Sequence, residues 1–392
     1  MPNHLFRRGL AALLMSGVSL HAALAMNGAT PLIIDGGPLG QFDLSGATDG
    51  FFFAQTGTAD KGNADNSILG SDATGARLGG MQFHLKKSTG IVQFNVIAGV
   101  FGGAPVLGTA PPRANTHTFP TSPVKLAYVT LALPGSPVTI SAGQVPSLEG
   151  YEDAVDFNNA NIFASTAWYV ENGASRGISA TYTKGPAALT VTYGDGWETG
   201  VFNVIQTIGS YNFNANNSLS LFYTGNLSRT GNNTRTYGGY KLASYGTNYV
   251  NSQLFGAFYS WTCGNLNLVP EVQYVYAKPD QEVGIKKYTA NFTAVVVGDY
   301  NFGASPYSLG GLVEYFDSVG TTRNSQNYWF IAPGAAGVGV ELTPTWQHGD
   351  IFARASASYL YLTDQGSPAA GYGNAGKTRD MVQVALEGGV LF

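Results

Sequence analysis

Hydrophobic and polar residues alternate with a period of two along the end of the chain, MVQVALEGGVLF, from Met381 to Phe392. Counted back from Phe392, the residues of one parity are apolar apart from a glycine, whereas Gln383 and Glu387 fall on the other face. This period is typical of a β-strand with one apolar and one polar side. Soluble domains commonly end in a frayed, polar tail. The apolar face therefore needs a covering of its own.

The same alternation recurs from about residue 48 to the end of the chain. It is clear in LNLVPEVQYVYA (residues 266–277), in GVGVEL (337–342) and in IFARASASYLYL (351–362). Helical periodicity of 3.6 residues does not persist for more than a turn or two. The pattern predicts an all-β chain. Alternation alone fits a β-sandwich as well as a transmembrane β-barrel.

The lengths of the connections favour the barrel, because long, polar connections alternate with short turns as they do in outer-membrane barrels. The alternation holds if residues 145–174 form one long loop after the fifth strand. Sixteen strands then place both termini at the periplasmic end, and fourteen and eighteen remain as alternatives. The expected strands are 48–56, 76–87, 90–100, 124–133, 137–145, 175–184, 186–194, 201–213, 217–226, 250–263, 265–277, 288–302, 307–317, 335–346, 349–362 and 380–392.

The N-terminal segment predicts export. Arg7 and Arg8 precede an apolar run from Gly9 to Leu20, which is too short to span a bilayer and is followed by an Ala-Leu-Ala site ending at Ala25. We therefore interpret residues 1–25 as a cleaved secretory signal peptide. The expected organisation continues with a periplasmic segment at 26–47 and a barrel at 48–392.

Composition supports this interpretation. Charged residues make up 11% of the chain, whereas soluble proteins average about 25%. Loss of residues 1–25, which carry two arginines and no acid, changes the net charge from −4 to −6. This mild acidity argues against a nucleic-acid partner. Cys263 is the single cysteine, so the chain has no internal disulfide.

The segment from Gly143 to Trp197 resembles the putative β-barrel porin-2 family, the OmpL-like outer-membrane porins. The resemblance rests on the motif Gly150-Tyr151-Glu152, an Asn-rich patch from Asn158 to Asn161, a glycine that opens a strand at Gly177, and the pair Gly196-Trp197. The terminal Phe392 looks like the C-terminal recognition signal of outer-membrane proteins. The resemblance implies a passive porin in the outer membrane of a Gram-negative bacterium.

Selectivity in such a pore depends on charge at its narrowest point. The long loop at 145–174 carries five acids and no lysine or arginine, and it would bring negative charge into the lumen if it folds inward. The alternative is a solvated extracellular loop whose acids attract cations only loosely. The candidate constriction residues are Glu149, Glu152, Asp153, Asp156 and Glu171.

Charged residues within strands form a second candidate set, because an ionisable side chain facing lipid would cost about 2–4 kcal/mol at the bilayer midplane. Four acids and one base have the inward parity. This ratio favours cations or neutral solutes over anions. The lumen-facing residues are Glu271, Glu314, Glu341, Arg354 and Glu387.

The sequence predicts no catalytic residue, no metal site and no cofactor. After the signal peptide only His84, His117 and His348 remain, too scattered for a catalytic triad or a set of metal ligands. The rival hypotheses are a barrel enzyme or dedicated substrate transporter and, less strongly, a secreted β-sandwich or adhesin. The expected partners are outer-membrane lipid, the barrel-assembly machinery and small solutes, and a homotrimer is one assembly that analogy of fold leaves open.

Overall fold

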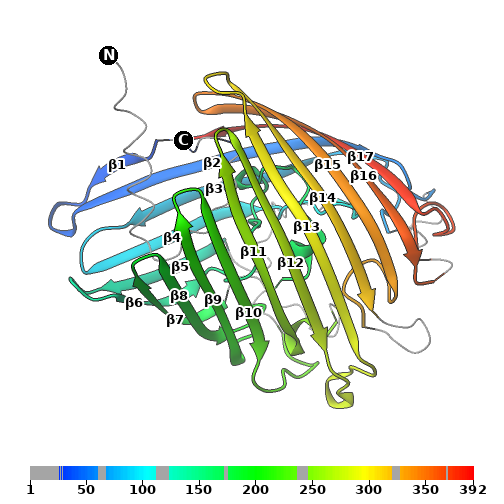
Figure 1. Cartoon of the computed structure of the whole chain (residues 1–392), viewed down its shortest axis with the longest axis horizontal. Helices are drawn as coiled ribbons and strands as arrows, with labels where there is room; N and C mark the ends of the chain where they lie inside the picture. The colour runs from blue at the N-terminus through cyan, green and yellow to red at the C-terminus, as the bar shows by residue number, and fades with distance from the viewer. Residues whose placement is uncertain are drawn as a thin grey trace.

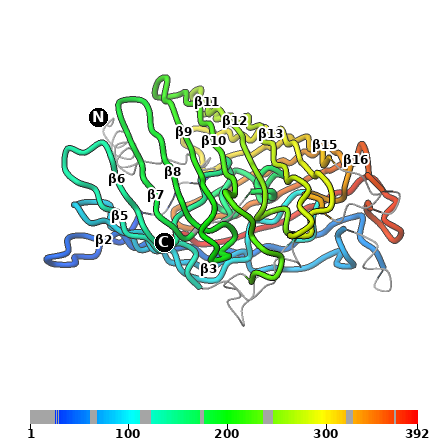
Figure 2. Tube along the Cα trace, turned by 90° about the horizontal axis from the view of Figure 1, so that it is seen from below, coloured from blue at the N-terminus to red at the C-terminus, as the bar shows by residue number. Residues whose placement is uncertain are grey.

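The computed structural model describes residues 26, 28, 30–60, 68–111, 123–171, 175–235, 246–319, 327–367 and 370–392. The predicted signal peptide, residues 1–25, and His117 lie outside these ranges. In the described part of the chain, sixteen long strands pair antiparallel in sequence order, and the last of them also pairs with the first. The sheet is a closed barrel (Figures 1 and 2), so the predicted all-β fold with sixteen strands is confirmed.

The barrel strands are β2 (Gln41–Gln55), β3 (Thr74–Lys87), β4 (Val92–Phe101), β5 (Val124–Ala132), β6 (Val138–Val145), β7 (Ser175–Lys184), β8 (Ala187–Asp195), β9 (Phe202–Asn214), β10 (Asn217–Asn226), β11 (Gln253–Cys263), β12 (Leu266–Ala277), β13 (Thr289–Asn301), β14 (Tyr307–Val319), β15 (Ala335–His348), β16 (Ile351–Gln365) and β17 (Asp380–Leu391). A short strand, β1 (Leu32–Asp35), precedes them. The short helices are η1 (Gly37–Leu39), η3 (Asp156–Asn158), α2 (Thr166–Tyr169), η5 (Tyr249–Asn251) and η6 (Gln281–Val283). No helix among the described residues has the length and apolarity needed to cross a membrane.

Short turns and longer connections alternate between the two ends of the barrel. Several of the turns have two residues and begin with a glycine at positive φ, as at Gly185, Gly264 and Gly349, a conformation that tight hairpins require. The two longer connections that matter below are L2 (residues 102–123) and L3 (residues 146–174). The C-terminus lies at the end with the short turns, in the upper left part of Figure 1.

The first barrel strand begins earlier than the alternation suggested. β2 starts at Gln41, where position 48 was expected, so part of the segment assigned to 26–47 belongs to the sheet. β1 pairs with residues 41–44 of β2. It lies on the same edge of β2 as β17, which pairs with β2 from Ala47 onward. The end of the chain is held there too, because Phe392 and Gly46 exchange two backbone hydrogen bonds, of 2.9 and 2.6 Å.

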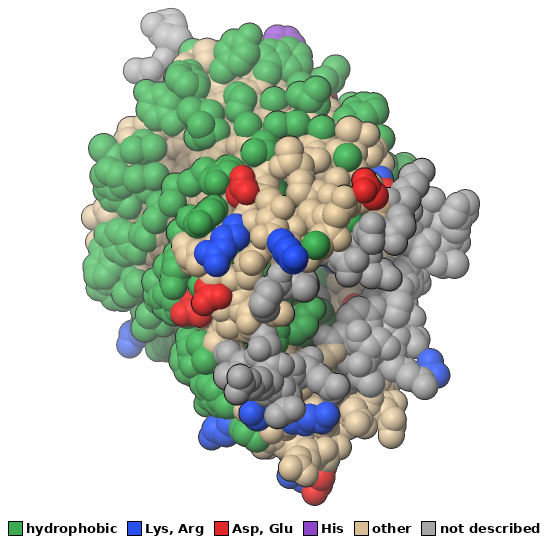
Figure 3. All heavy atoms as spheres, turned by 90° about the vertical axis from the view of Figure 1, so that its right-hand side faces the viewer, with side chains coloured by type: hydrophobic (Ala, Val, Ile, Leu, Met, Phe, Trp, Pro, Cys, Tyr) green, Lys and Arg blue, Asp and Glu red, His purple; other side chains and the backbone are tan. Residues whose placement is uncertain are grey.

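The two faces of each strand differ as the period of two predicts. On β17, Val384 and Leu386 are exposed on the outer face, whereas Gln383 and Glu387 are buried on the inner face. Hydrophobic side chains cover a broad area of the molecule in Figure 3, and most of the visible charged side chains lie outside that area. The apolar face of the last strand therefore contacts the surroundings of the barrel, and the polar face of that strand points into the barrel.

One side of the lumen is packed with protein. Leu107 of L2 and Leu148, Ile162 and Phe163 of L3 are buried in a cluster with inward-facing apolar residues of the strands, such as Phe316 of β14. L2 and L3 also pair with each other, since the N–H of Leu107 donates to the carbonyl oxygen of Ala164 at 3.0 Å. A barrel of sixteen strands is wide enough to leave an aqueous channel in place of a packed core. The two connections instead build a core along this side, because each carries enough apolar residues to bury.

Candidate functional site in the barrel lumen

Three glutamates on the inner wall hold the backbone of L3. Glu314 accepts the N–H of Thr166 at 2.7 Å, Glu341 accepts that of Phe163 at 3.1 Å, and Glu271 accepts that of Tyr151 at 3.1 Å. A loop inside a barrel has no sheet ladder to satisfy its N–H groups, so other acceptors must do so. The carboxyl oxygens of these three glutamates serve as those acceptors.

Other wall residues complete this attachment. Gln206 of β9 accepts the N–H of Leu148 at 3.1 Å, and Gln383 of β17 accepts the N–H of Gly108 in L2 at 3.2 Å. Arg354 of β16 donates to the carbonyl oxygen of Asn159 at 3.0 Å. The inner faces of strands from β9 to β17 thus carry the polar side chains that hydrogen-bond to the backbone of L2 and L3. We call this set of side chains the polar socket.

This socket changes the role expected for the inward-facing charges. The sequence predicts that Glu271, Glu314, Glu341, Arg354 and Glu387 face the lumen. They do lie on the inner wall, but the structure buries all five, each at most 4% exposed. Arg354 and Glu387 form an ion pair with side chains that are fully buried. These residues contact L3 or each other and do not face open solvent. The correction follows from L3 folding against this wall, which strand parity cannot reveal.

The five acids of L3 separate into two groups. Glu149, Glu152, Asp153 and Glu171 line a cavity beside the loop, whereas Asp156 is buried away from that cavity. Glu152 accepts hydrogen bonds from the N–H and the hydroxyl of Ser165, and burial raises its pKa to about 7. Burial, together with the nearby Glu271 and Glu149, raises the pKa of Glu171 well above its usual range.

The cavity has a volume of about 710 Å³ and lies between L3 and the wall that the strands β2 to β5 form. Its lining extends from Gly46 and Leu391, near the C-terminus, to Trp197 in the connection between β8 and β9. On the wall side the lining includes His84 of β3 and Lys125 of β5. The space therefore runs along the side of the lumen that L2 and L3 leave unpacked.

Lys125 reaches this cavity through a β-bulge. Ile97 pairs with Leu126 and Ala98 with Val124, so Lys125 is the extra residue in β5. A bulge of this kind re-aims a side chain. The Lys125 Nζ lies 3.5 Å from an Asp153 carboxylate oxygen and 5.4 Å from the ring centroid of Phe101.

Sequence reasoning missed Lys125 because the parity of β5 assigns it to the outer face, with Val129 and Leu131. The signal that could have found it is the cost of a lysine facing lipid, about 2–4 kcal/mol at midplane. Gln144 supports the bulge by donating to the carbonyl oxygens of Lys125 and Val124, at 2.7 and 3.2 Å.

The remaining wall carries uncharged polar groups. Inward-facing hydroxyls pair across neighbouring strands from β5 to β10, at distances of 2.7 to 2.9 Å, in Thr130–Ser141, Thr181–Thr190, Thr192–Ser179 and Ser210–Ser220. His84 bonds to Asn95 at 2.7 Å, not to a serine or a carboxylate. His348 lies in β15 at the end of the barrel with the short turns. Neither His84 nor His348 therefore forms part of a Ser-His-Asp catalytic triad.

Comparison with known proteins also indicates a porin-like β-barrel. The family model described as "Putative beta-barrel porin-2, OmpL-like" matches residues 41–392, and no curated protein sequence matches the chain. Among solved structures, an anion-selective porin from Comamonas acidovorans is similar with a TM-score of 0.58 at 12% identity, covering 90% of this chain and 99% of that one. OmpF of Salmonella typhi, solved with daunomycin, gives 0.55 at 13% identity, covering 92% and 100%. OmpT of Vibrio cholerae gives 0.53 at 12% identity, covering 90% and 97%.

The family match begins at Gln41, the first residue of β2, and ends with the chain, so it spans the whole barrel. The solved structures share the fold at a low level of identity. The chain belongs to the putative beta-barrel porin-2, OmpL-like family, and it is an outer-membrane porin, a channel and not an enzyme.

Proposed function

We propose that small hydrophilic solutes and ions diffuse through the barrel along the cavity between L3 and the wall of β2 to β5. The carrying observation is the cavity itself, whose lining extends from Gly46 and Leu391 to Trp197. Passage involves no bond chemistry. Solutes partition according to the width of the passage, its hydrogen-bonding groups and the sign of its field.

The lining carries more acids than bases, which supports a preference for cations and neutral solutes over anions. Four carboxylates of L3 contribute to the lining, and the basic side chains there are Lys125 and His84. The anion selectivity of the Comamonas acidovorans porin is a property of that protein. Shared fold at 12% identity carries no information on the sign of the field in this chain.

Planar-bilayer recordings in a gradient of KCl test this proposal directly. We expect a reversal potential on the cation-selective side for the wild-type protein and a smaller one for Asp153→Asn. Asp350→Asn, in the turn before β16, is the matched control and should leave the reversal potential unchanged. An anion-selective reversal potential in the wild-type protein would contradict the proposed sign. Absence of conductance steps would contradict the passage.

Export, assembly and oligomeric state belong to the same proposal. We propose cleavage after Ala25, recognition of Phe392 by the barrel-assembly machinery, and a homotrimer in the membrane. The ring of Phe392 lies at 5.7 Å from that of Phe83, which supports a defined place for the terminal residue. N-terminal sequencing of the protein from outer membranes tests the cleavage, and cross-linking in intact membranes tests the trimer.

A further inference from the structure

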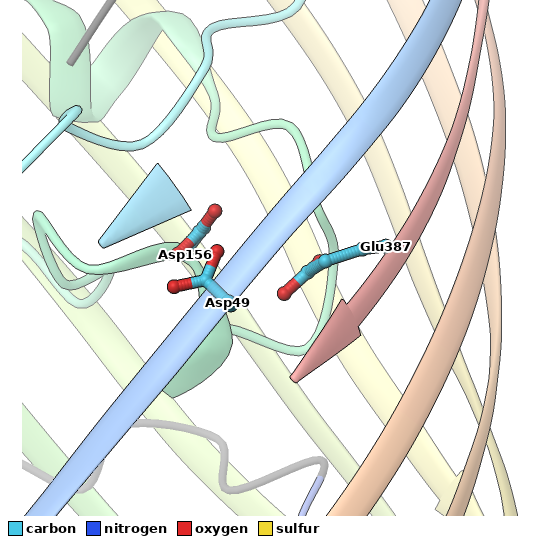
Figure 4. Close-up of side chains that lie close together, drawn as sticks. All are labelled: Asp49, Asp156 and Glu387. Carbon is cyan, nitrogen blue, oxygen red and sulfur yellow. The ribbon is translucent and has the colours of Figure 1, made fainter. Parts of the chain in front are cut away.

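Three carboxylates from distant parts of the chain meet inside the barrel. Asp49 comes from β2, Asp156 from η3 in L3, and Glu387 from β17, and one oxygen of each lies within 4.8 Å of the other two (Figure 4). All three side chains belong to residues that are at most 4% exposed. The cluster therefore joins the first barrel strand, the last barrel strand and L3.

Four of the six carboxylate oxygens in this cluster have no hydrogen-bond partner among the described residues. Both Asp49 oxygens, Asp156 Oδ2 and Glu387 Oε1 are buried and lack a partner of ordinary hydrogen-bond geometry. The other two oxygens are used, because Asp156 Oδ1 accepts the N–H of Phe157 at 2.9 Å and Glu387 Oε2 accepts from Arg354. Buried polar atoms without partners are costly, and buried charges more so. The free oxygens point to a ligand.

The charge of the cluster indicates the kind of ligand. Three carboxylates face one guanidinium, that of Arg354, and its Nη1 already donates to the carbonyl oxygen of Asn159. The nearby Lys125 is paired with Asp153. Three negative charges and one positive charge leave a deficit that a single divalent cation would neutralise.

The backbone around Asp49 leaves the room that this arrangement needs. Asp49 pairs with Gly80 and Gly50 with Leu78, so Gly79 is the extra residue of a bulge in β3. A Cβ on Gly79 would lie 1.7 Å from Asp49 Oδ2 and 3.0 Å from Asp156 Oδ2. Only a glycine at this position lets the two carboxylates turn toward each other.

We propose that Asp49, Asp156 and Glu387 bind one Ca²⁺, which fastens L3 to the seam where β2 and β17 close the barrel. All the protein donors are oxygens, the ligands that Ca²⁺ prefers, and its bonds of about 2.3–2.6 Å suit oxygens at these separations. Mg²⁺ demands a tighter octahedron at about 2.0–2.1 Å and gives up its waters reluctantly. Water and backbone carbonyl oxygens would complete the coordination shell.

Calorimetric titration of the full-length barrel in detergent, stripped with EDTA, tests the proposal with CaCl₂ as the probe. We expect one Ca²⁺ per chain, and at least about a tenfold loss of affinity in Asp49→Asn and in Asp156→Asn, since affinity follows the number of charged ligands. Asp299→Asn is the matched control. Asp299 is equally buried but bonds to Asn267 and Asn301, and its variant should bind Ca²⁺ as the wild type does.

The migration of unheated and heated samples on gels provides a second readout. A difference in migration between the two samples shows first that each variant is folded. Ca²⁺ should raise the unfolding temperature of the wild-type barrel and leave that of Asp49→Asn unchanged. In EDTA, Asp49→Asn should unfold no earlier than the wild type, because the substitution removes a buried like charge.

If the wild type binds no Ca²⁺ at concentrations up to about 10 mM, the proposed site is wrong, because even the weakest extracellular calcium modules bind below that concentration. A proton shared among the carboxylates would then account for the cluster. Equal binding of Mg²⁺, or a loss of affinity in Asp299→Asn as large as in Asp49→Asn, overturns the assignment as well.

Discussion

The Nζ of Lys125 lies 3.5 Å from the carboxylate of Asp153, so the wall of the barrel and L3 face each other with opposite charges beside the cavity. Porins whose passage has acids on one side and a base on the other sort ions by the balance of the two. In this chain the base reaches the lumen only through the bulge in β5. A single substitution can therefore change the balance of negative and positive charge beside the cavity.

Lys125→Gln should increase the preference for cations. A unit charge at about 4 Å is worth about 1 kcal/mol in water, so we expect the ratio of cation to anion permeability to change about twofold to fivefold. Reversal potentials in a KCl gradient measure the ratio. Lys184→Gln, at the exposed end of β7, is the control and should have no effect. An unchanged ratio in Lys125→Gln would remove this residue from the passage.

Glu152 should make selectivity depend on pH. Its pKa is raised to about 7 by burial, so the group is mostly neutral at pH 6 and mostly charged at pH 8. The permeability ratio for cations over anions should therefore rise between these values as the proton leaves. Glu152→Gln should flatten this step. A step of equal size in the variant would assign the titration to another group.

Glu314→Ala should loosen L3. The substitution leaves the buried N–H of Thr166 without its acceptor, which costs about 1–3 kcal/mol. We expect a lower unfolding temperature and noisier open-channel current. Glu282→Ala removes an ion pair with Arg229 at the surface, where solvent screens the two charges, and serves as the control. Equal effects of the two variants would argue against the anchoring role.

Leu386→Arg tests the outward face of β17. Leu386 is exposed on that face, and arginine costs about 2–4 kcal/mol near the bilayer midplane but about 0–1 kcal/mol near the interfaces. Equilibrium unfolding in lipid vesicles measures the loss. Leu133→Arg, in the turn between β5 and β6, should be tolerated. Similar losses at both positions would contradict the expected placement of Leu386 at depth.

Deletion of Phe392 should reduce the amount of assembled barrel in the outer membrane. The residue bonds to Gly46 through its backbone, so the deletion also opens the end of the seam between β17 and β2. Phe302→Ala, another exposed aromatic at the same end, is the control. Comparison of refolding in vitro with assembly in cells separates the two effects, since a defect confined to cells indicates loss of a recognition signal.

The sequence by itself determined the barrel. Alternation such as that of Val384 and Leu386 with Gln383 and Glu387 depends only on the geometry of a strand, and the lengths of the connections gave the number and direction of the strands. The boundaries were accurate to a few residues except at the start of β2. There the polar and apolar residues alternate from Gln41 to Ser45, but Gly46 and Ala47 interrupt the pattern, and pairing with β1 and β3 makes the whole segment one strand.

The tertiary structure decided what the inward-facing residues do. Parity showed that Glu271, Glu314 and Glu341 point inward, but the N–H groups they accept come from L3, more than a hundred residues earlier in the chain. The bulge that turns Lys125 into the lumen, and the meeting of Asp49, Asp156 and Glu387, depend on register and on the path of a loop. Local periodicity carries no record of either, because both are set by packing between segments that are remote in the sequence.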